Sequence, residues 1–503
     1  MMSFLTTHIL TLILFLPVLG ALVLLFLPGT QVRLIRWLAF GLSLIPFALS
    51  LAAWAQFNPT ITGFQFEENI PWYPAINSFY HLGIDGISLT MLLLTTLLTP
   101  LAILASFSIT DRIKAYMMLF LFLETGMLGV FLSLDLLLFF VFWEVGLVPM
   151  YFLINQWGGV NRNYASLKFI LFTMAGSLGL LLAIQMLGVV AGTYDLPALM
   201  IKWTALSGSL FGLPVGTVKA IAFWAFVIAF AIKVPIWPFH TWLPDAHTEA
   251  PTGASMLLAG VLLKLGAYGF LRLVLPLYPV ESQRFAGPLA AFATMGIIFG
   301  ALGALGQTDF KRLVAYSSIS HMGVVILGIA AAAWAAGTDT ARMAMNGAVL
   351  QMINHGLSAA GMFFLVGVLY ERTHTRDLRA YGGLFALVPV YGGILLFTAM
   401  GSLGLPGLGG FVSEFLVVRA AWPVFTYAVI LSMIGLFFTG AYILKALKAV
   451  LHGPLNDIWV GHLSEINPRE IAVIAPLMVL MLIIGFWPSW ILDVINRTVS
   501  ALF

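Results

Sequence analysis

The sequence predicts an all-α protein that crosses a membrane about fourteen times. Of its 503 residues, 61% are hydrophobic and only 9% are charged. An ordinary soluble domain carries about a quarter charged residues, because charge keeps its surface in water. The chain instead consists of apolar runs of about 20 residues, the length that a helix needs to cross the hydrocarbon core. These observations predict a polytopic membrane protein without a separate soluble domain.

The apolar runs follow one another with short connections. In chain order they lie at residues 8–27, 33–54, 87–109, 115–132, 133–155, 165–193, 216–248, 253–275, 286–306, 312–335, 344–369, 383–422, 424–450 and 470–495. The seventh and twelfth runs are too long for one crossing and contain Pro or Gly, so we expect broken helices there. We expect three helices in residues 1–114, five-helix repeats in 115–275 and 286–450, and a C-terminal loop and last helix in 451–503.

Charge and cysteine content exclude several classes of function. The net charge of +3 is small and scattered, so no nucleic-acid partner is expected. The chain has no cysteine, which excludes disulfides, iron–sulfur ligation and c-type haem attachment within it. Lys and Arg are about twice as frequent in the loops that face the cytoplasm when both termini lie outside, so we expect that orientation.

Five ionisable residues fall inside the apolar runs. They are Glu124, Glu144, Lys233, Lys264 and Glu414. A charge at membrane depth costs several kcal/mol unless it is hydrated or paired, so each indicates a functional site. For Glu144 and Lys233 the alternative is a static ion pair that only joins two helices, and Glu124 has no obvious partner.

The first predicted break follows Lys233 directly. Pro235 and Pro238 each remove a backbone donor and clash with the preceding turn, so the helix must end near the lysine. In a membrane, a broken helix is tolerated only where protein or water satisfies the freed carbonyl groups. We therefore expect a polar, hydrated environment beside Lys233.

The second break lies in GSLGLPGLGGFVSEF, which contains Pro406 and Gly407 and then reaches Glu414. Broken helices that carry a charge at the midplane are typical of ion pathways. Glu144 and Lys233 are separated by nearly the same number of residues as His321 and Glu414, which predicts two repeats displaced by five helices. Because five is odd, the repeats are expected to be inverted across the membrane.

Three further polar residues connect the predicted repeats. Lys264, His321 and His355 interrupt otherwise apolar helices. Histidine titrates near neutrality and a buried lysine can also exchange its proton, so the set is suited to stepwise proton transfer. Interhelical hydrogen bonding without transport is the alternative.

A metal site is not expected. His240, Asp245, His247 and Glu249 lie close together in the sequence, but Pro244 disrupts the helical facing that a shared ligand set requires. His240 and Glu124 remain possible members of a proton path.

The assembled motifs resemble the antiporter-like, proton-translocating subunits of respiratory complex I, and among them the M type (NuoM type). The resemblance rests on LGIDGIS, DLLLFFVFWEVGLVPMYFLI, IKVPIWPFHTWLPDAHTEAP, LLAGVLLKLGAYGFLR, VAYSSISHMG, QMINHGLSAAGMFFLVG, YERTHTRDLR and LPGLGGFVSEF. It implies fourteen helices with two inverted five-helix repeats and broken seventh and twelfth helices. Related subunits generally carry lysine where this chain has Glu414, which points to the M type.

The resemblance also implies roles for the buried residues. Glu144 would pair with Lys233, Lys264 would be the central relay, His321 and His355 would connect the halves, and Glu414 would be the terminal group. The chain itself would carry no redox chemistry: NADH or another donor, flavin, iron–sulfur clusters and quinone are expected in other subunits.

The expected function is therefore proton translocation by the membrane arm of a complex I-type quinone oxidoreductase. Antiporter-like neighbours on both sides, lipids and an energy-transducing bacterial inner or plasma membrane are the expected surroundings. The alternatives are a subunit of a multisubunit sodium/proton antiporter or of a membrane-bound hydrogenase, and, in a third class, a structural scaffold whose buried charges only pair.

Overall fold

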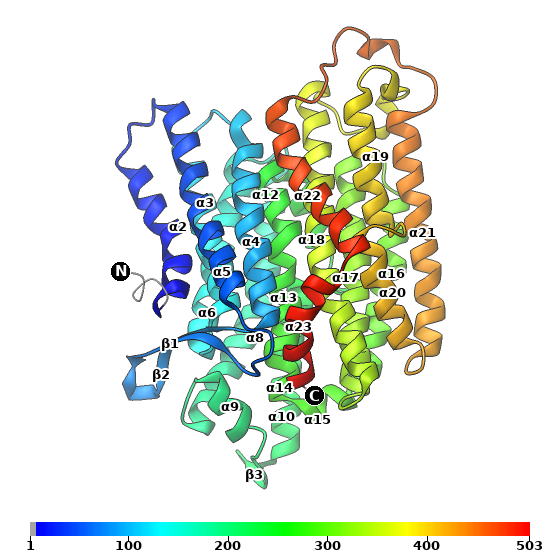
Figure 1. The fold of residues 1–503 in the computed structure, drawn as a ribbon. Coiled ribbons are helices and arrows are strands. Elements are labelled where there is room, and N and C mark those ends of the chain that lie inside the picture. The colour runs from blue at the N-terminus through cyan, green and yellow to red at the C-terminus, as the bar shows by residue number, and fades with distance from the viewer. Residues whose placement is uncertain (1–6, 503) are drawn as a thin grey trace.

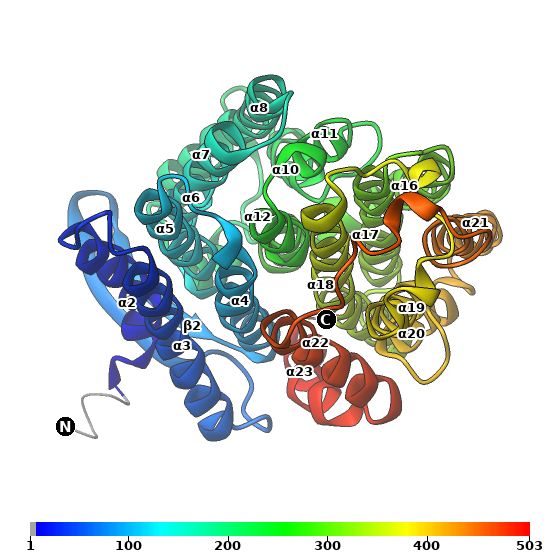
Figure 2. The ribbon, with the colours of Figure 1, turned by 90° about the horizontal axis from the view of Figure 1, so that it is seen from above.

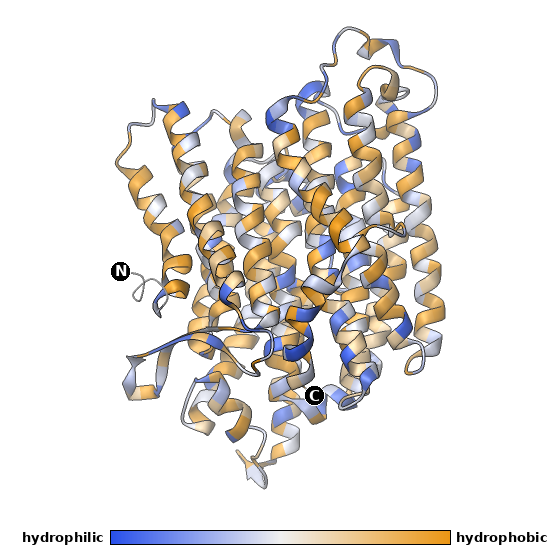
Figure 3. Cartoon of the chain, in the orientation of Figure 1, coloured by the Kyte–Doolittle hydropathy of each residue, from blue (hydrophilic) through white to orange (hydrophobic). Residues whose placement is uncertain are grey.

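The computed structural model describes residues 7–502 as a bundle of long helices with two small antiparallel β-pairs outside it (Figure 1). Within these residues, 12 helices are long and apolar enough to cross a membrane, and Ile9–Leu25 and Pro389–Leu403 are shorter apolar helices. Each predicted run contains a helix, so the polytopic all-α fold class is confirmed. Apolar residues dominate the helices, and polar residues gather at their ends and in the connections (Figure 3).

The first half of the chain begins with the helices that flank the bundle. The helices of this half are α2 (Ile9–Leu25), α3 (Val32–Gln56), α4 (Gly86–Ala105), α5 (Ile113–Leu132), α6 (Leu136–Val145), α7 (Leu147–Trp157), α8 (Arg162–Ala191), α9 (Leu196–Lys202), α10 (Val215–Lys233), α11 (Trp242–Glu249), α12 (Thr252–Leu257), α13 (Leu263–Gly269) and α14 (Leu275–Leu277). The π-helical turns η3 (Leu258–Leu262) and η4 (Phe270–Val274) lie on the two sides of α13.

The second half has longer uninterrupted helices. They are α15 (Pro279–Arg284), α16 (Ala286–Leu305), α17 (Phe310–Trp334), α18 (Asp339–Thr373), α19 (Pro389–Leu403), α20 (Gly409–Ala421), α21 (Thr426–Leu451), α22 (Pro468–Phe486) and α23 (Ser489–Ala501). Short 3₁₀ turns are η1 (Pro74–Ile76), η2 (Ser106–Ser108), η5 (Leu378–Ala380), η6 (Leu384–Ala386) and η7 (Asp457–Trp459). The run predicted at 470–495 therefore holds two helices, because Pro488 interrupts it.

The centre of the bundle is formed by helices that carry the polar residues. Figure 2 shows α12 and α18 in the middle, with α3, α8 and α21 at the periphery. The spans Thr252–Leu277 and Asp339–Thr373 are buried over their whole apolar windows, whereas only 28% of the window of Val32–Gln56 is buried. Polar side chains on the central helices must therefore find partners within the protein, since lipid offers none.

Two antiparallel strand pairs lie at the end of the bundle opposite the 452–467 loop. Strands β1 (Gln65–Tyr73) and β2 (Ser78–Ile84) form a hairpin, and β3 (Ser209–Leu210) pairs with β4 (Leu213–Pro214). The sequence analysis did not predict either pair. In the larger hairpin, His81 contacts Asp195 at 2.7 Å and Glu67 at 3.0 Å. Burial lowers the pKa of His81, but the two carboxylates outweigh it, so the pKa is raised.

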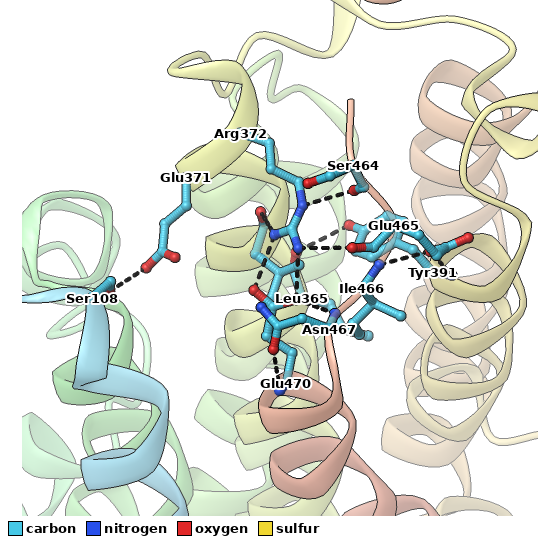
Figure 4. Close-up of polar contacts among 11 residues, drawn as sticks. Ser108, Leu365, Glu371, Arg372, Tyr391, Ser464, Glu465, Ile466, Asn467 and Glu470 are labelled. Atoms are coloured by element: carbon cyan, nitrogen blue, oxygen red, sulfur yellow. Dashed lines mark hydrogen bonds and ion pairs between the residues drawn. The ribbon is translucent and has the colours of Figure 1, made fainter. Parts of the chain in front are cut away.

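The loop 452–467 crosses one end of the bundle and is fastened there (Figure 4). Arg372, near the end of α18, forms an ion pair with Glu470 at 2.7 Å and donates to the backbone oxygen of Ser464 at 2.9 Å. The Glu465 carboxylate accepts the N–H groups of Val390 and Tyr391 at the start of α19. These contacts fix the end of α18 relative to the broken helix α19–α20.

Candidate functional site: a buried polar row

The first break separates α10 from α11, as Pro235 and Pro238 predict. Helix α10 ends at Lys233, and the chain becomes helical again at Trp242. The Trp242 indole N–H donates to the Ile232 oxygen at 2.9 Å, and the Ile236 N–H donates to Ala231 at 2.7 Å. Protein groups therefore satisfy carbonyl oxygens that the break releases.

Lys233 is 3% exposed and lies against an aromatic ring. Its Nζ is 5.1 Å from the ring centroid of Trp143, a distance at which a cation is attracted to an indole face. None of the ion pairs within 4.0 Å among the described residues includes this ammonium group, and the partnership of Lys233 with Glu144 stays a prediction. Glu144 still interacts with Lys233 through its charge, and its buried Oε1 has no hydrogen-bond partner.

Lys264 lies at the centre of the bundle and is fully buried. The π-helical turn before it widens the helix, and the side chain reaches back to the Ala259 oxygen of that turn at 2.5 Å. Its Nζ is also 2.8 Å from Nδ1 of His355 on α18. Lys264 and His355, both predicted members of the proton path, are thus in direct contact.

The polar row continues from His355 to His321. The two imidazole rings have centroids 5.7 Å apart, and Nε2 of each ring has no hydrogen-bond partner. His321 Nδ1 then lies 3.0 Å from Oε1 of Glu414, which also accepts a hydrogen bond from Gln351 at 3.1 Å. Glu414 is 8% exposed, so Lys264, His355, His321 and Glu414 form one buried row across α13, α18, α17 and α20.

The second break places Glu414 at the end of this row. Helix α19 ends at Leu403, its capping residue Gly404 has a φ of +81°, a left-handed conformation that favours glycine, and α20 begins at Gly409. Asn354 on α18 donates to the Gly409 oxygen at 2.7 Å and to Ser413 at 3.0 Å. The start of α20 is therefore tied to the same helix that carries His355. Pro406 and Gly407 lie in the break, as predicted.

Two predicted members of the proton path lie apart from the row. Glu124 is fully buried on α5, and neither carboxylate oxygen has a hydrogen-bond partner. His240 lies after the first break, is partly exposed and interacts with the charge of Lys168. Within residues 7–502, no group of three or more His, Cys, Asp or Glu side chains is arranged to hold a metal ion.

Sequence reasoning missed two residues of this region. Trp143 contacts Lys233, and its position directly before Glu144 was the only available signal. His247 was considered only as a metal ligand, yet it is fully buried and neither ring nitrogen has a hydrogen-bond partner. Its separation from Lys264 in sequence gave no indication that the fold brings them near each other.

Comparisons with known proteins agree with this architecture. Residues 133–439 match the family described as NADH:quinone oxidoreductase/Mrp antiporter, TM. NADH-quinone oxidoreductase subunit M of Rhodobacter capsulatus is 39% identical, over 98% of this chain and 96% of its own. NAD(P)H-quinone oxidoreductase chain 4 1 of Synechococcus elongatus is 42% identical, over 98% and 91%.

A solved structure extends the likeness to the three-dimensional fold. A chain of respiratory complex I from Thermus thermophilus with bound NADH superposes with a TM-score of 0.87 and 28% identity, and 98% of each chain is covered. The likeness includes the segments that carry Lys233, Lys264 and Glu414, since they lie within residues 133–439. The chain therefore belongs to the NADH:quinone oxidoreductase/Mrp antiporter membrane family, and its relatives in that family include subunit M of NADH-quinone oxidoreductase.

Proposed function

We propose that this chain is a proton-translocating, non-redox subunit in the membrane arm of a complex I-type quinone oxidoreductase. The observation that carries the proposal is the buried row Lys264, His355, His321 and Glu414, with contacts of 2.8 Å at one end and 3.0 Å at the other. Every member of the row can both hold and release a proton. A scaffold has no use for such a row, because the buried Nε2 atoms of His355 and His321 have no hydrogen-bond partner and therefore cost stability.

The row transfers protons by exchange between neighbours. Lys264 donates to His355 Nδ1, and a hop between the two imidazoles brings the proton to His321, whose Nδ1 faces Glu414. Ring rotation or a bridging water spans the 5.7 Å between the imidazole centroids. Lys233 keeps its proton while the charge of Glu144 is near it, and releases the proton towards Lys264 when that charge moves away.

The energy of such a switch is adequate. Moving one charge against 100 mV costs about 2.3 kcal/mol. A hydrogen bond to a charged group contributes about 1.5–3 kcal/mol. Making or breaking one contact in the row, for example the one between His321 and Glu414, therefore changes the free energy by about as much as one transfer requires.

The redox chemistry belongs to other subunits in this proposal. NADH or another donor, flavin, iron–sulfur clusters and quinone are bound elsewhere, because the chain has no cysteine to ligate a cluster. Antiporter-like subunits lie on both sides, within a bacterial inner or plasma membrane. The Rhodobacter relative, which is named as a subunit of such an oxidoreductase, supports this placement.

We further propose that residues 115–275 and 286–450 are inverted repeats. Each contains one interrupted helix with a buried charge beside the break, Lys233 before the first and Glu414 after the second. The repeats are displaced by five helices, and an odd displacement makes the second repeat cross the membrane in the opposite direction to the first. The repeats would meet where Lys264 contacts His355.

The proposal is tested by purification and reconstitution. A tagged chain isolated from its native membrane should carry flavin and iron–sulfur subunits and reduce quinone. In proteoliposomes, Lys264→Ala should keep quinone reduction under uncoupled conditions but lower the number of protons moved per electron. Isolation without redox subunits, together with sodium-dependent proton exchange, would instead identify the antiporter alternative.

A further inference from the structure

An apolar cavity opens on the side of the bundle where the first and last helices of the chain come together. Its volume is about 180 Å³, and it is lined by residues of α3, α4, α18, α22 and α23. Figure 2 shows α4 between α3 and α22 at this place. Leu51 of α3 is 47% exposed and Leu93 of α4 is partly exposed, so the cavity opens outwards at these residues. Both lie within membrane-spanning helices, so the opening faces lipid.

The lining of the cavity suits a hydrocarbon chain. It consists mainly of Leu, Ile, Phe and Trp side chains. Thr90 contributes a hydroxyl group, but that group already donates to the Ile87 oxygen at 2.8 Å. An apolar void leaves the atoms around it without dispersion partners, and in a membrane the neighbouring lipid tails are able to supply them.

Two arginines lie at the end of the bundle where α22 begins. Arg36 of α3 donates from Nη2 to the Ile109 oxygen at 2.7 Å, and its buried Nε has no hydrogen-bond partner. Its charge interacts with that of Arg469, the second residue of α22. None of the ion pairs within residues 7–502 includes either arginine, and the adjacent Glu470 is already paired with Arg372 at 2.7 Å. Two like charges therefore lie near each other without a carboxylate partner.

Each of these arginines lies on the same helix face as a residue of the cavity. Arg36 and Phe47 are eleven residues apart on α3, and Arg469 and Leu480 are eleven residues apart on α22. Eleven residues make about three helical turns and a rise of about 16 Å. Half of the hydrocarbon core of a bilayer is about 15 Å thick. A phospholipid whose phosphate lies at the arginines therefore has the end of its acyl chain at the level of the cavity.

We infer that this side of the chain binds one anionic phospholipid, whose phosphate lies at Arg36 and Arg469 and whose acyl chain ends in the cavity. Guanidinium groups bind phosphate oxygens through paired N–H donors, and the free Nε of Arg36 is such a donor. Basic residues at the membrane surface favour anionic over neutral headgroups. The inference does not depend on the proposed function, because it uses none of the residues of the polar row.

The test uses the intact complex and a photoreactive lipid. The probe is phosphatidylglycerol with a diazirine at the end of one acyl chain, added in trace amount to phosphatidylcholine vesicles that contain the complex. After irradiation and digestion, mass spectrometry should find the label on the peptides that contain Phe47 and Leu480. Added unlabelled phosphatidylglycerol should lower this label at least several-fold more than the same amount of added phosphatidylcholine.

Variants separate the two ends of the site. Arg36→Gln combined with Arg469→Gln should lower the label several-fold, whereas Arg162→Gln, at the exposed first residue of α8, is the control and should not. Leu93→Trp places an indole in the cavity and should also lower the label. Leu182→Trp, at a side chain that is 72% exposed on α8, is its control.

Three results would overturn the inference. Equal competition by the two lipids in the wild-type complex would show that the headgroup is not recognised, and this result requires no variant. An unchanged label in the assembled double arginine variant or in Leu93→Trp would show that the lipid lies elsewhere. In Leu51→Cys the introduced cysteine is alone in the chain. If this thiol were cross-linked to another subunit while Phe47 and Leu480 stayed unlabelled, a protein segment would cover the cavity instead of a lipid.

Discussion

Replacing Glu414 with Gln separates a structural role of this carboxylate from a proton-carrying role. Oε1 of Glu414 accepts hydrogen bonds from His321 at 3.0 Å and Gln351 at 3.1 Å. Glutamine has the same shape, and its amide oxygen can accept both bonds without charge. Since charged hydrogen bonds contribute about 1.5–3 kcal/mol and neutral ones about 0.5–1.5, the expected cost is about 2–3 kcal/mol for the pair. That loss is small enough for the bundle to remain folded.

Proton transfer, in contrast, should be lost in Glu414→Gln, because an amide cannot take up a proton at neutral pH. The assay is the proton-to-electron ratio of reconstituted complex, with subunit content followed on native gels. Asp339→Asn, at a side chain that is 90% exposed, provides the control. Glu414→Asp should retain part of the ratio. A wild-type ratio in the glutamine variant, with normal assembly, would refute the role of Glu414 in the row.

Three further predictions concern other parts of the molecule. Lys233→Arg should assemble but not translocate, because guanidinium does not release its proton; full pumping measured in vesicles would mean that only the positive charge matters. Arg272→Gln should destabilise the subunit by about 3–5 kcal/mol, since it removes the cation of the buried 2.5 Å ion pair with Asp85; heated native gels should show earlier loss than in Arg342→Gln, whose pair is exposed. The raised pKa of His81 means that its contacts stabilise the hairpin fully below about pH 6.5, the unfolded value, and lose this contribution as pH rises through the folded pKa; hydrogen exchange of β1 and β2 should show this loosening, and an unchanged pH dependence in His81→Gln would contradict it.

The parts of the fold that follow from local chemistry could be predicted from the sequence. Pro235 and Pro238 cannot continue a helix, and α10 ends at Lys233 accordingly. Apolar runs of membrane length predicted the helices, because every crossing of the lipid needs about 20 apolar residues whose backbone groups bond to one another. The spacing of His321 and Glu414 marked both as members of one proton path, and the structure places them 3.0 Å apart.

The remainder depends on packing that the sequence pattern does not specify. The ring of Trp143, the residue before Glu144, lies against the Lys233 ammonium group. Which of two adjacent α6 side chains faces Lys233 depends on how α6 is rotated about its axis, and the sequence does not specify that angle. The β1–β2 hairpin lies in the connection between two membrane helices, and hydropathy shows only that this connection is polar, not that it forms strands. The sequence associated His247 only with a possible metal cluster. Its electrostatic partners Lys311 and Lys264 lie on two other helices, which the sequence pattern does not bring together.

The most direct measurement of the row is infrared difference spectroscopy of the complex during turnover. If protons pass along Lys264, His355, His321 and Glu414, a protonated carboxyl band of Glu414 should appear or change on adding the electron donor and shift in heavy water. The band should be missing from Glu414→Gln and strongly reduced in Lys264→Ala, since the proton then no longer reaches the end of the row. A turnover-dependent band that persists unchanged in Glu414→Gln, or no carboxyl signal at all in a pumping complex, would contradict the account.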